Sequence, residues 1–181
     1  MNMVVSETTL PGVYVVDLDR RQDERGFFAR SWCCDEFEAI GLETRMAQCS
    51  VSFNLRRGTI RGMHYQEQPY PETKLVRCTM GAIYDVAIDL RPESPTLRQW
   101  VAVELTAQNR RALYIPAGFA HGFQTLLDSS EVFYQMSEFY HPDAARAVRW
   151  NDPAFGILWP LPKPFLSEKD RAIPDFSGKE V

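Results

Sequence analysis

The segment Gly58–Gly81, GTIRGMHYQEQPYPETKLVRCTMG, contains the pattern that decides the fold. Its first half, around Arg61 to His64, reads as a β-strand, in which successive side chains point to opposite faces. This alternation predicts that Arg61 and Met63 lie on one face of the strand and that Gly62 and His64 lie on the other.

The second half of the segment is predicted to return along a neighbouring strand. Residues Gln68-Pro69-Tyr70-Pro71 predict a loop, because proline lacks the backbone N–H that a central strand needs. The run Thr73–Cys78 then alternates again and carries Lys74 and Arg77. The segment therefore gathers a histidine, a lysine and arginine on one antiparallel scaffold, which suits an anionic substrate whose carbon loses a proton.

Short β-rich runs separated by glycine and proline continue on both sides of this segment. Such a pattern, with hardly any helix, indicates an all-β antiparallel sandwich or barrel with a few short helices. No repeat or linker interrupts it, so residues 1–181 are expected to form a single domain. The other predicted strands are Leu10–Leu18, Met46–Phe53, Ile83–Leu90, Trp100–Leu105, Arg111–Ile115, Gly122–Leu127 and Glu131–Met136.

Two short helical segments are predicted. Cys34–Ile40 places Phe37 and Ile40 on one face and is followed by Gly41 as a stop. Near the end of the chain, Ser167 is expected to cap a single turn that reaches Asp170. Around this turn, residues 150–181 predict a tail that packs over the domain.

Composition restricts the class of protein further. The net charge of −4 argues against nucleic acid as a partner, and no apolar run approaches the ~18 residues of a membrane helix. The sequence shows no secretory signal pattern, and its four cysteines form no C-x-x-C pair, which predicts reduced thiols and a cytoplasmic location.

Seven motifs occur in an order and at separations that match a known family. The chain resembles the dTDP-4-dehydrorhamnose 3,5-epimerases of rhamnose biosynthesis nearly from end to end. The motifs are Asp23-Glu-Arg25-Gly-Phe27, Arg61-Gly-Met-His64-Tyr-Gln66, Lys74-Leu-Val-Arg77, Asp85-Val-Ala-Ile-Asp89-Leu-Arg91, Ile115-Pro-Ala-Gly-Phe-Ala-His121-Gly-Phe, Trp150-Asn-Asp152-Pro and Ser167-Glu-Lys-Asp170.

The resemblance implies a cupin-type jelly roll without a cofactor or metal. It also implies a homodimer in which an N-terminal arm, residues 1–22, is exchanged between the subunits. The implied substrate is a 4-keto-6-deoxyhexose on a nucleoside diphosphate, whose C3 and C5 protons are acidic because they lie beside the ketone. Epimerisation at both carbons of dTDP-4-keto-6-deoxyglucose would then proceed through enolates.

The resemblance also implies roles for particular residues. His64 is the candidate base, since imidazole titrates near neutral pH, and Asp170 would hold its tautomer. A single strand histidine is often only a hydrogen-bonded core residue, but the flanking Arg61 and Lys74 favour catalysis. Lys74 corresponds to the cation that stabilises the enolate and Tyr134 to the general acid. Positions that match substrate contacts are Arg25, Gln48, Ser50, Arg61, His121, Tyr140 and Lys169.

Three departures from the family pattern leave the nucleotide open. Arg30 and Ala145 replace acidic residues, and Gln48-Cys49-Ser50 replaces Gln-Asp-Asn. These positions surround the nucleoside and sugar in the family, so a GDP- or CDP-linked 4-keto sugar, or inversion at C3 alone, is the alternative within the same chemistry.

Two other classes of protein compete with this interpretation. A metal-dependent cupin enzyme needs an H-x-H ligand segment, and here the second position is Gln66 in a chain with only three histidines. A non-catalytic sugar-binding jelly roll would have no use for the combination of His64, Lys74, Tyr134 and Asp170.

Overall fold

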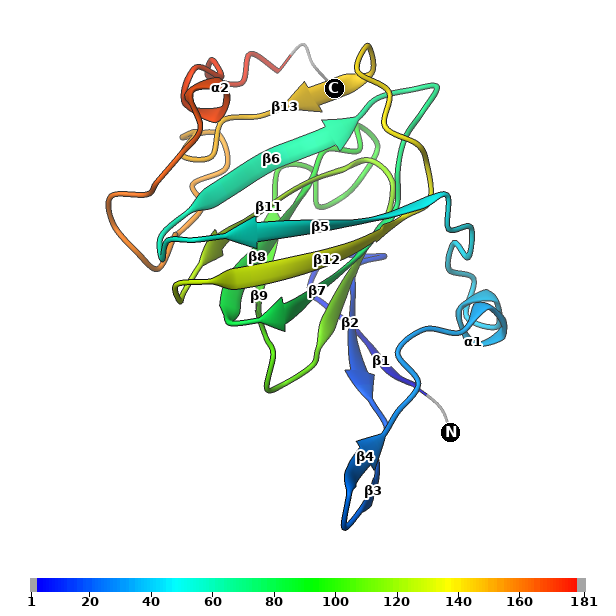
Figure 1. Ribbon diagram of the computed structural model, residues 1–181. Helices are drawn as coiled ribbons and strands as arrows, with labels where there is room; N and C mark the ends of the chain where they lie inside the picture. Colours follow the sequence, from blue (N-terminus) through cyan, green and yellow to red (C-terminus); the bar gives the residue numbers. More distant parts are fainter. Residues whose placement is uncertain (1–2, 179–181) are drawn as a thin grey trace.

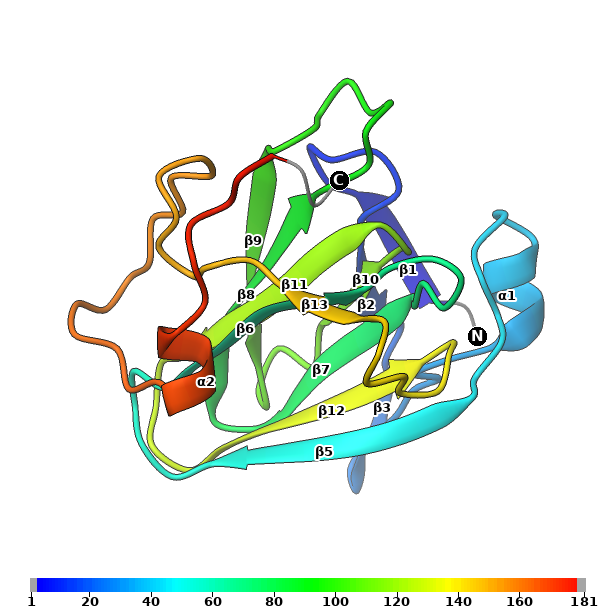
Figure 2. The same ribbon diagram turned by 90° about the horizontal axis from the view of Figure 1, so that it is seen from above.

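The computed structural model describes residues 3–178, which form two antiparallel β-sheets packed against each other (Figures 1 and 2). The first two residues of the expected arm 1–22 and the last three of the expected tail 150–181 lie outside the described residues. One sheet has the order β1 (Met3–Glu7), β2 (Tyr14–Leu18), β10 (Ala112–Ile115), β7 (Lys74–Met80), β12 (Ser130–Met136), β5 (Gln48–Asn54). The other has the order β13 (Ala145–Ala147), β6 (Ile60–Gln66), β11 (Phe119–Thr125), β8 (Ala82–Asp89), β9 (Trp100–Thr106). The predicted all-β class is therefore confirmed.

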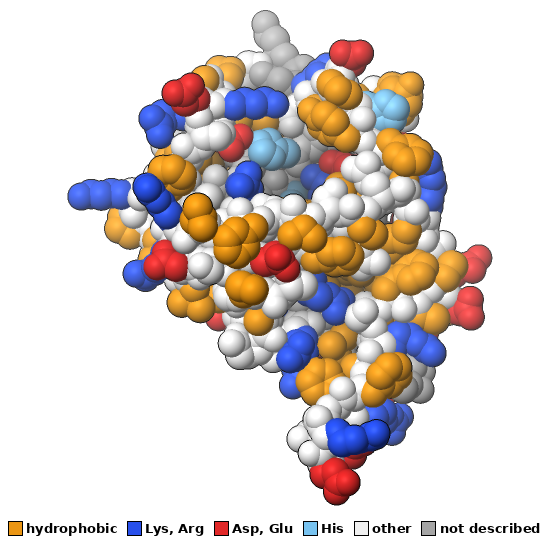
Figure 3. Space-filling view, viewed as in Figure 1, with side chains coloured by type: hydrophobic (Ala, Val, Ile, Leu, Met, Phe, Trp, Pro, Cys, Tyr) orange, Lys and Arg blue, Asp and Glu red, His pale blue; other side chains and the backbone are white. Residues whose placement is uncertain are grey.

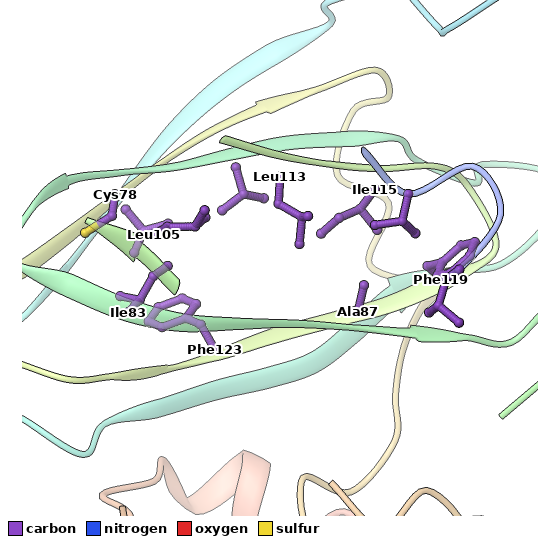
Figure 4. Close-up of a cluster of buried hydrophobic side chains, with 12 residues drawn as sticks. Cys78, Ile83, Ala87, Leu105, Leu113, Ile115, Phe119 and Phe123 are labelled. Carbon is purple, nitrogen blue, oxygen red and sulfur yellow. The ribbon is translucent and has the colours of Figure 1, made fainter. Parts of the chain in front are cut away.

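The main core lies between the two sheets (Figure 4). Alternate residues of β7, β8, β10 and β11 point inward, so Ile83, Leu113 and Phe123 are almost completely buried. Each such side chain stabilises the fold by about 1.5–3 kcal/mol. This packing fills one end of the sandwich and leaves the other end open for polar side chains.

A β-bulge in β6 overturns the predicted alternation of Arg61 and His64. His121 of β11 pairs with His64 and Phe123 pairs with Arg61, so three steps along β6 match two along β11. Arg61 and His64 therefore face the same cavity, whereas Met63 is buried in a second core cluster on the other side of the sheet. A Cβ atom on Gly122 would lie 2.7 Å from the Arg61 carbonyl oxygen, so the close approach of the strands requires glycine.

Other differences from the sequence prediction concern element ends. The first predicted strand begins at Tyr14 rather than Leu10, because Pro11 and Gly12 form a turn, with Gly12 at a φ of 90°. Four short strands, Met3–Glu7, Arg21–Asp23, Gly26–Phe28 and Ala145–Ala147, were not predicted. Helix α1 (Cys34–Glu38) buries Phe37, but Ile40 lies beyond its end and is exposed.

The two ends of the chain leave the sandwich in different ways. Strands β3 (Arg21–Asp23) and β4 (Gly26–Phe28) form a hairpin that projects from the body (Figure 1). In contrast, the Phe165 backbone bonds to Gly58 and Ile60 beside the start of β6. This contact leads into helix α2 (Glu168–Arg171) at the open end of the sandwich. Neither helix described in residues 3–178 is long and apolar enough to cross a membrane.

Candidate active site

A cavity of about 540 Å³ opens at the end of the sandwich that the hydrophobic core leaves free. Figure 3 shows it as a hollow in which histidine and basic side chains are visible. Strands from both sheets and helix α2 contribute to its wall. It contains ten of the eleven predicted site residues: Gln48, Ser50, Arg61, His64, Lys74, His121, Tyr134, Tyr140, Lys169 and Asp170.

His64 and Asp170 form a hydrogen-bonded pair in the cavity. Nε2 of His64 lies 2.8 Å from Oδ1 of Asp170. The His64 side chain is 45% exposed, while that of Asp170 is 7% exposed. Since a carboxylate can only accept, Nε2 carries the hydrogen and Nδ1 of the neutral ring keeps a lone pair. The pair therefore presents an imidazole that can accept a proton at Nδ1.

The tail positions Asp170 through a short helix with a defined cap. The Ser167 hydroxyl oxygen accepts from the Asp170 amide at 3.0 Å, and this hydroxyl donates to Asp170 Oδ2 at 2.9 Å. Burial by itself raises the pKa of Asp170, but the hydrogen bond and charge of His64, then Ser167 and Lys169, lower it below its usual value. Asp170 is thus held as a carboxylate that can stabilise protonated His64.

Lys74 supplies a cation at the first residue of β7. Its side chain is only 9% exposed, and its Nζ lies 3.0 Å from Glu72 Oε1. Nζ also donates to the His64 carbonyl oxygen at 3.3 Å. The ammonium group is therefore tied to the strand that carries the candidate base.

Tyr134 lies on β12 with its side chain in the cavity wall. Burial strongly raises the pKa of its phenol and the nearby Asp85 raises it further, while Arg61 and a hydrogen bond with Ser52 lower it. The net direction is upward, so the phenol keeps its proton at neutral pH and can act as an acid.

A second His–Asp pair is buried in the cavity wall, where His121 is one of the lining residues. His121 Nε2 lies 2.8 Å from Asp85 Oδ1, and the two side chains are 5% and 0% exposed. The His121 ring packs edge-on against Tyr134 with the ring centroids 6.0 Å apart. This pair fixes the position of His121 and supports the Tyr134 ring.

The rim of the cavity depends on the buried side chain of Gln66. Its Nε2 donates to the carbonyl oxygens of Tyr70 and Phe139, at 3.0 and 3.1 Å. Its Oε1 accepts from the His141 amide at 2.6 Å. Gln66 thus joins the 67–73 loop to the loop that carries Tyr140, whose side chain stands exposed at the entrance.

Arg25 is the predicted site residue that lies elsewhere. It occupies the tip of the β3–β4 hairpin, where its guanidinium pairs with Asp23 at 2.6 Å and is largely exposed. The hairpin projects away from the cavity of its own chain (Figure 1). Within a single chain, Arg25 is therefore not part of the site.

Several cavity residues were not predicted from the sequence. They are Ser52, Tyr65, Gln66, Glu72, Phe123, Met136, Arg146 and Ala147. Glu72 could have been found, because it lies two positions before Lys74 in an extended stretch and alternate residues share a face. Of the three departures, Ser50 and Ala145 line the cavity, whereas Arg30 pairs with Glu36 at 2.6 Å outside it.

No group of three or more His, Cys, Asp or Glu side chains among residues 3–178 could hold a metal ion. The cavity instead combines a carboxylate-paired imidazole, an enclosed ammonium and a protonated phenol. These groups on an antiparallel β-sandwich define an acid–base isomerase of the cupin-type jelly-roll class.

Comparison with known proteins identifies the family. The sequence pattern of the dTDP-4-dehydrorhamnose 3,5-epimerases matches residues 7–178. The chain belongs to this family, as the sequence resemblance predicted. The epimerase of Shigella flexneri is 43% identical over 169 residues, which cover 93% of each protein.

Solved structures agree with this assignment. The crystal structure of dTDP-4-dehydrorhamnose 3,5-epimerase from Elizabethkingia anophelis superposes with a TM-score of 0.96 at 34% identity, covering 100% of both chains. ChmJ, a 3'-monoepimerase from Streptomyces bikiniensis in complex with dTDP-quinovose, has a TM-score of 0.86 at 32% identity, covering 97% of this chain and 87% of ChmJ. The predicted jelly roll and isomerase class are thereby confirmed.

Proposed function

We propose that the protein inverts C3 and C5 of dTDP-4-keto-6-deoxyglucose through enolate intermediates, in the biosynthesis of rhamnose. The observation that carries this proposal is the placement of His64, Asp170, Lys74 and Tyr134 around one cavity. No cofactor is required, since the ketone at C4 already makes the neighbouring C–H bonds acidic.

Proton abstraction is assigned to His64. Its exposed ring can take the C3 or C5 proton, and the Asp170 carboxylate stabilises the imidazolium that results. Negative charge then develops on the C4 oxygen. The Lys74 ammonium, enclosed in the cavity wall, is the group that stabilises this charge.

Proton return is assigned to Tyr134. Inversion requires that the new proton arrives on the face opposite to the base. Tyr134 lies on β12 and His64 on β6, and these strands belong to different sheets with the cavity between them. A phenol whose pKa is raised by burial holds its proton until the enolate carbon takes it.

Basic residues at the cavity suit the diphosphate. Arg61 lines the cavity and donates to Asn54 Oδ1 at 2.7 Å, which fixes its guanidinium. Lys169 lies on α2 beside Asp170, and Arg146 lies on β13. Guanidinium and ammonium groups bind phosphate oxygens through charge-assisted hydrogen bonds.

A homodimer with exchanged N-terminal segments is part of the proposal. The hairpin that carries Arg25 projects from the body, so it can reach the cavity of a second subunit. Val51, Phe53 and Leu55 of β5 and the following turn are exposed, and Figure 3 shows an apolar band over this face. Such a surface fits a subunit interface. Sedimentation should therefore give twice the mass of the chain.

The deciding experiment is NMR of the purified protein with dTDP-4-keto-6-deoxyglucose in D2O. We expect deuterium at both C3 and C5, together with the inverted product. Exchange at C3 alone would assign a 3-epimerase, the candidate favoured by the similarity to ChmJ. If neither carbon takes up deuterium, dTDP-4-keto-6-deoxyglucose is not the substrate. The GDP- and CDP-linked sugars would then be assayed, and Ser50 and Ala145 would be the residues to mutate.

A further inference from the structure

Glu72 is an acidic side chain in a cavity proposed to bind an anionic substrate. Its carboxylate lines the cavity together with Arg61, Lys74, Arg146 and Lys169. A carboxylate at this place repels a diphosphate, unless it lies at the sugar end and its charge is neutralised by a cation. The side chain of Glu72 is only 11% exposed, so solvent screens its charge weakly.

Lys74 provides that cation. The two side chains meet at 3.0 Å between Glu72 Oε1 and Lys74 Nζ, and the same Nζ donates to the His64 carbonyl oxygen. The pair follows from the local sequence: in the extended run Glu72-Thr73-Lys74, the outer two residues project to the same side.

The backbone between the two residues is fixed on its other side. The Thr73 amide donates to the Ser137 hydroxyl oxygen at 2.8 Å, and the Ser137 amide donates to the Thr73 carbonyl at 3.0 Å. These bonds extend the pairing of β7 with β12 by one residue beyond Lys74 and Met136. Glu72 is therefore carried by the sheet and not by a loose part of the loop.

The Lys74 ammonium group has more hydrogen-bond donors than its partners in the cavity wall use. A lysine ammonium has three N–H donors. In this structure the ammonium donates one hydrogen bond, to the His64 carbonyl oxygen, and its Nζ forms an ion pair with Glu72 Oε1 at 3.0 Å. Both acceptors belong to the cavity wall, so the third donor is left for the cavity itself.

We propose that Glu72 is a positioning residue that orients the Lys74 ammonium, so that its third N–H donor meets the developing enolate oxygen. The assignment rests on the proposed function of Lys74. A preorganised donor stabilises a transition state more effectively than one that must reorient during the reaction. Glu72 itself does not contact the reacting carbons.

Three variants test this assignment by steady-state kinetics. Glu72→Ala should lower kcat by about 10- to 100-fold, the loss seen when a partner that orients a metal ligand is removed. KM and the Kd for dTDP should stay within about twofold of the wild type, since the interaction acts in the transition state. Glu72→Gln should retain more activity than Glu72→Ala, because the amide oxygen still accepts from the ammonium. Glu104→Ala removes an exposed carboxylate on β9, outside the cavity, and is the matched control.

A substrate-free readout separates this inference from the proposed function. The chain has four lysines, Lys74, Lys163, Lys169 and Lys179, so 15N NMR of the ammonium groups is simple to assign with Lys74→Arg. We expect the Lys74 ammonium protons to exchange slowly with water in the wild type and rapidly in Glu72→Ala, with melting curves confirming that the variant is folded.

Each pattern of results supports or overturns the inference. Reduced kcat with faster ammonium exchange supports it. Wild-type kcat, an unchanged Lys74 signal, or a loss confined to KM or dTDP affinity overturns it, the last by making Glu72 a ligand contact. If the wild type epimerises no 4-keto sugar, the proposed function fails, and the ammonium exchange still decides whether Glu72 orients Lys74.

Discussion

Two His–Asp pairs in this molecule have the same geometry in different surroundings. The distance from Nε2 to the carboxylate oxygen is 2.8 Å in both the His64–Asp170 pair and the His121–Asp85 pair. The His64 side chain is 45% exposed, whereas that of His121 is 5% exposed. Distance alone therefore does not identify a base; the ring must also be reachable by the substrate.

The origin of each pair explains this difference. His64 and His121 lie opposite each other on β6 and β11. Asp85 comes from β8, the strand on the other side of β11, so the sheet itself builds and buries that pair. Asp170 comes from the C-terminal tail and reaches His64 from the edge of the cavity. We expect the His64–Asp170 pair to control activity and the His121–Asp85 pair to control stability.

Removal of the His64 imidazole should have the largest effect on activity. His64→Ala is expected to lower kcat by about 10³-fold, because proton abstraction loses its base. The Kd for dTDP should change by no more than a few-fold in calorimetry, since the diphosphate contacts remain. A variant that exchanges the C3 proton at the wild-type rate would remove His64 from its assigned role.

The carboxylate of the same pair should matter less. Asp170→Asn is expected to lower kcat by about 10²-fold, because the amide can donate to the ring and favour the wrong tautomer. The free energy of unfolding in urea should fall by only about 1 kcal/mol, the contribution of a typical hydrogen bond. A variant with full activity would show that the tautomer of His64 is fixed by other groups.

The buried pair should give the opposite result. Asp85→Asn is expected to lower the free energy of unfolding by about 2 kcal/mol, because His121 loses a charged partner in a fully buried setting. At a temperature where the variant is folded, its kcat should exceed that of Asp170→Asn. If Asp85→Asn is as stable as the wild type and is inactive, the two pairs do not divide their roles as proposed.

The pH dependence of stability should give the smallest effect. The pKa of Asp170 is lowered in the folded protein from its ordinary value of 3.8. The carboxylate therefore stabilises the fold above that pH, and this contribution is lost as the pH falls through the lowered pKa. The difference in unfolding free energy between wild type and Asp170→Asn should shrink as the pH falls below about pH 4. A constant difference down to pH 2 would contradict the lowered pKa.

The sequence predicts the strands well because their signal is local. Alternation of apolar and polar residues identified β8 and β9, and proline marked the turn between them. Ile40 was wrongly placed on the buried face of α1. The end of a helix depends on tertiary contacts, and the spacing of apolar residues in the sequence carries no information about these contacts.

The site could be predicted only in part, for a geometric reason. The resemblance of the motifs to a known family selected ten side chains that line the cavity. The relative direction of Arg61 and His64 was wrong, because the bulge depends on the pairing of β6 with β11 and not on β6 alone. The position of Arg25 could not be predicted either, since a charged turn in sequence does not reveal how far a hairpin projects.

The origin of Asp170 in the tail has a consequence for how the protein is made. The partners His64 and Asp170 are 106 residues apart in the chain. During translation, both sheets can be complete while the imidazole still lacks its carboxylate. A nascent chain therefore lacks this carboxylate until the ribosome has added Asp170, and a chain that stops before this residue should turn over no faster than Asp170→Asn.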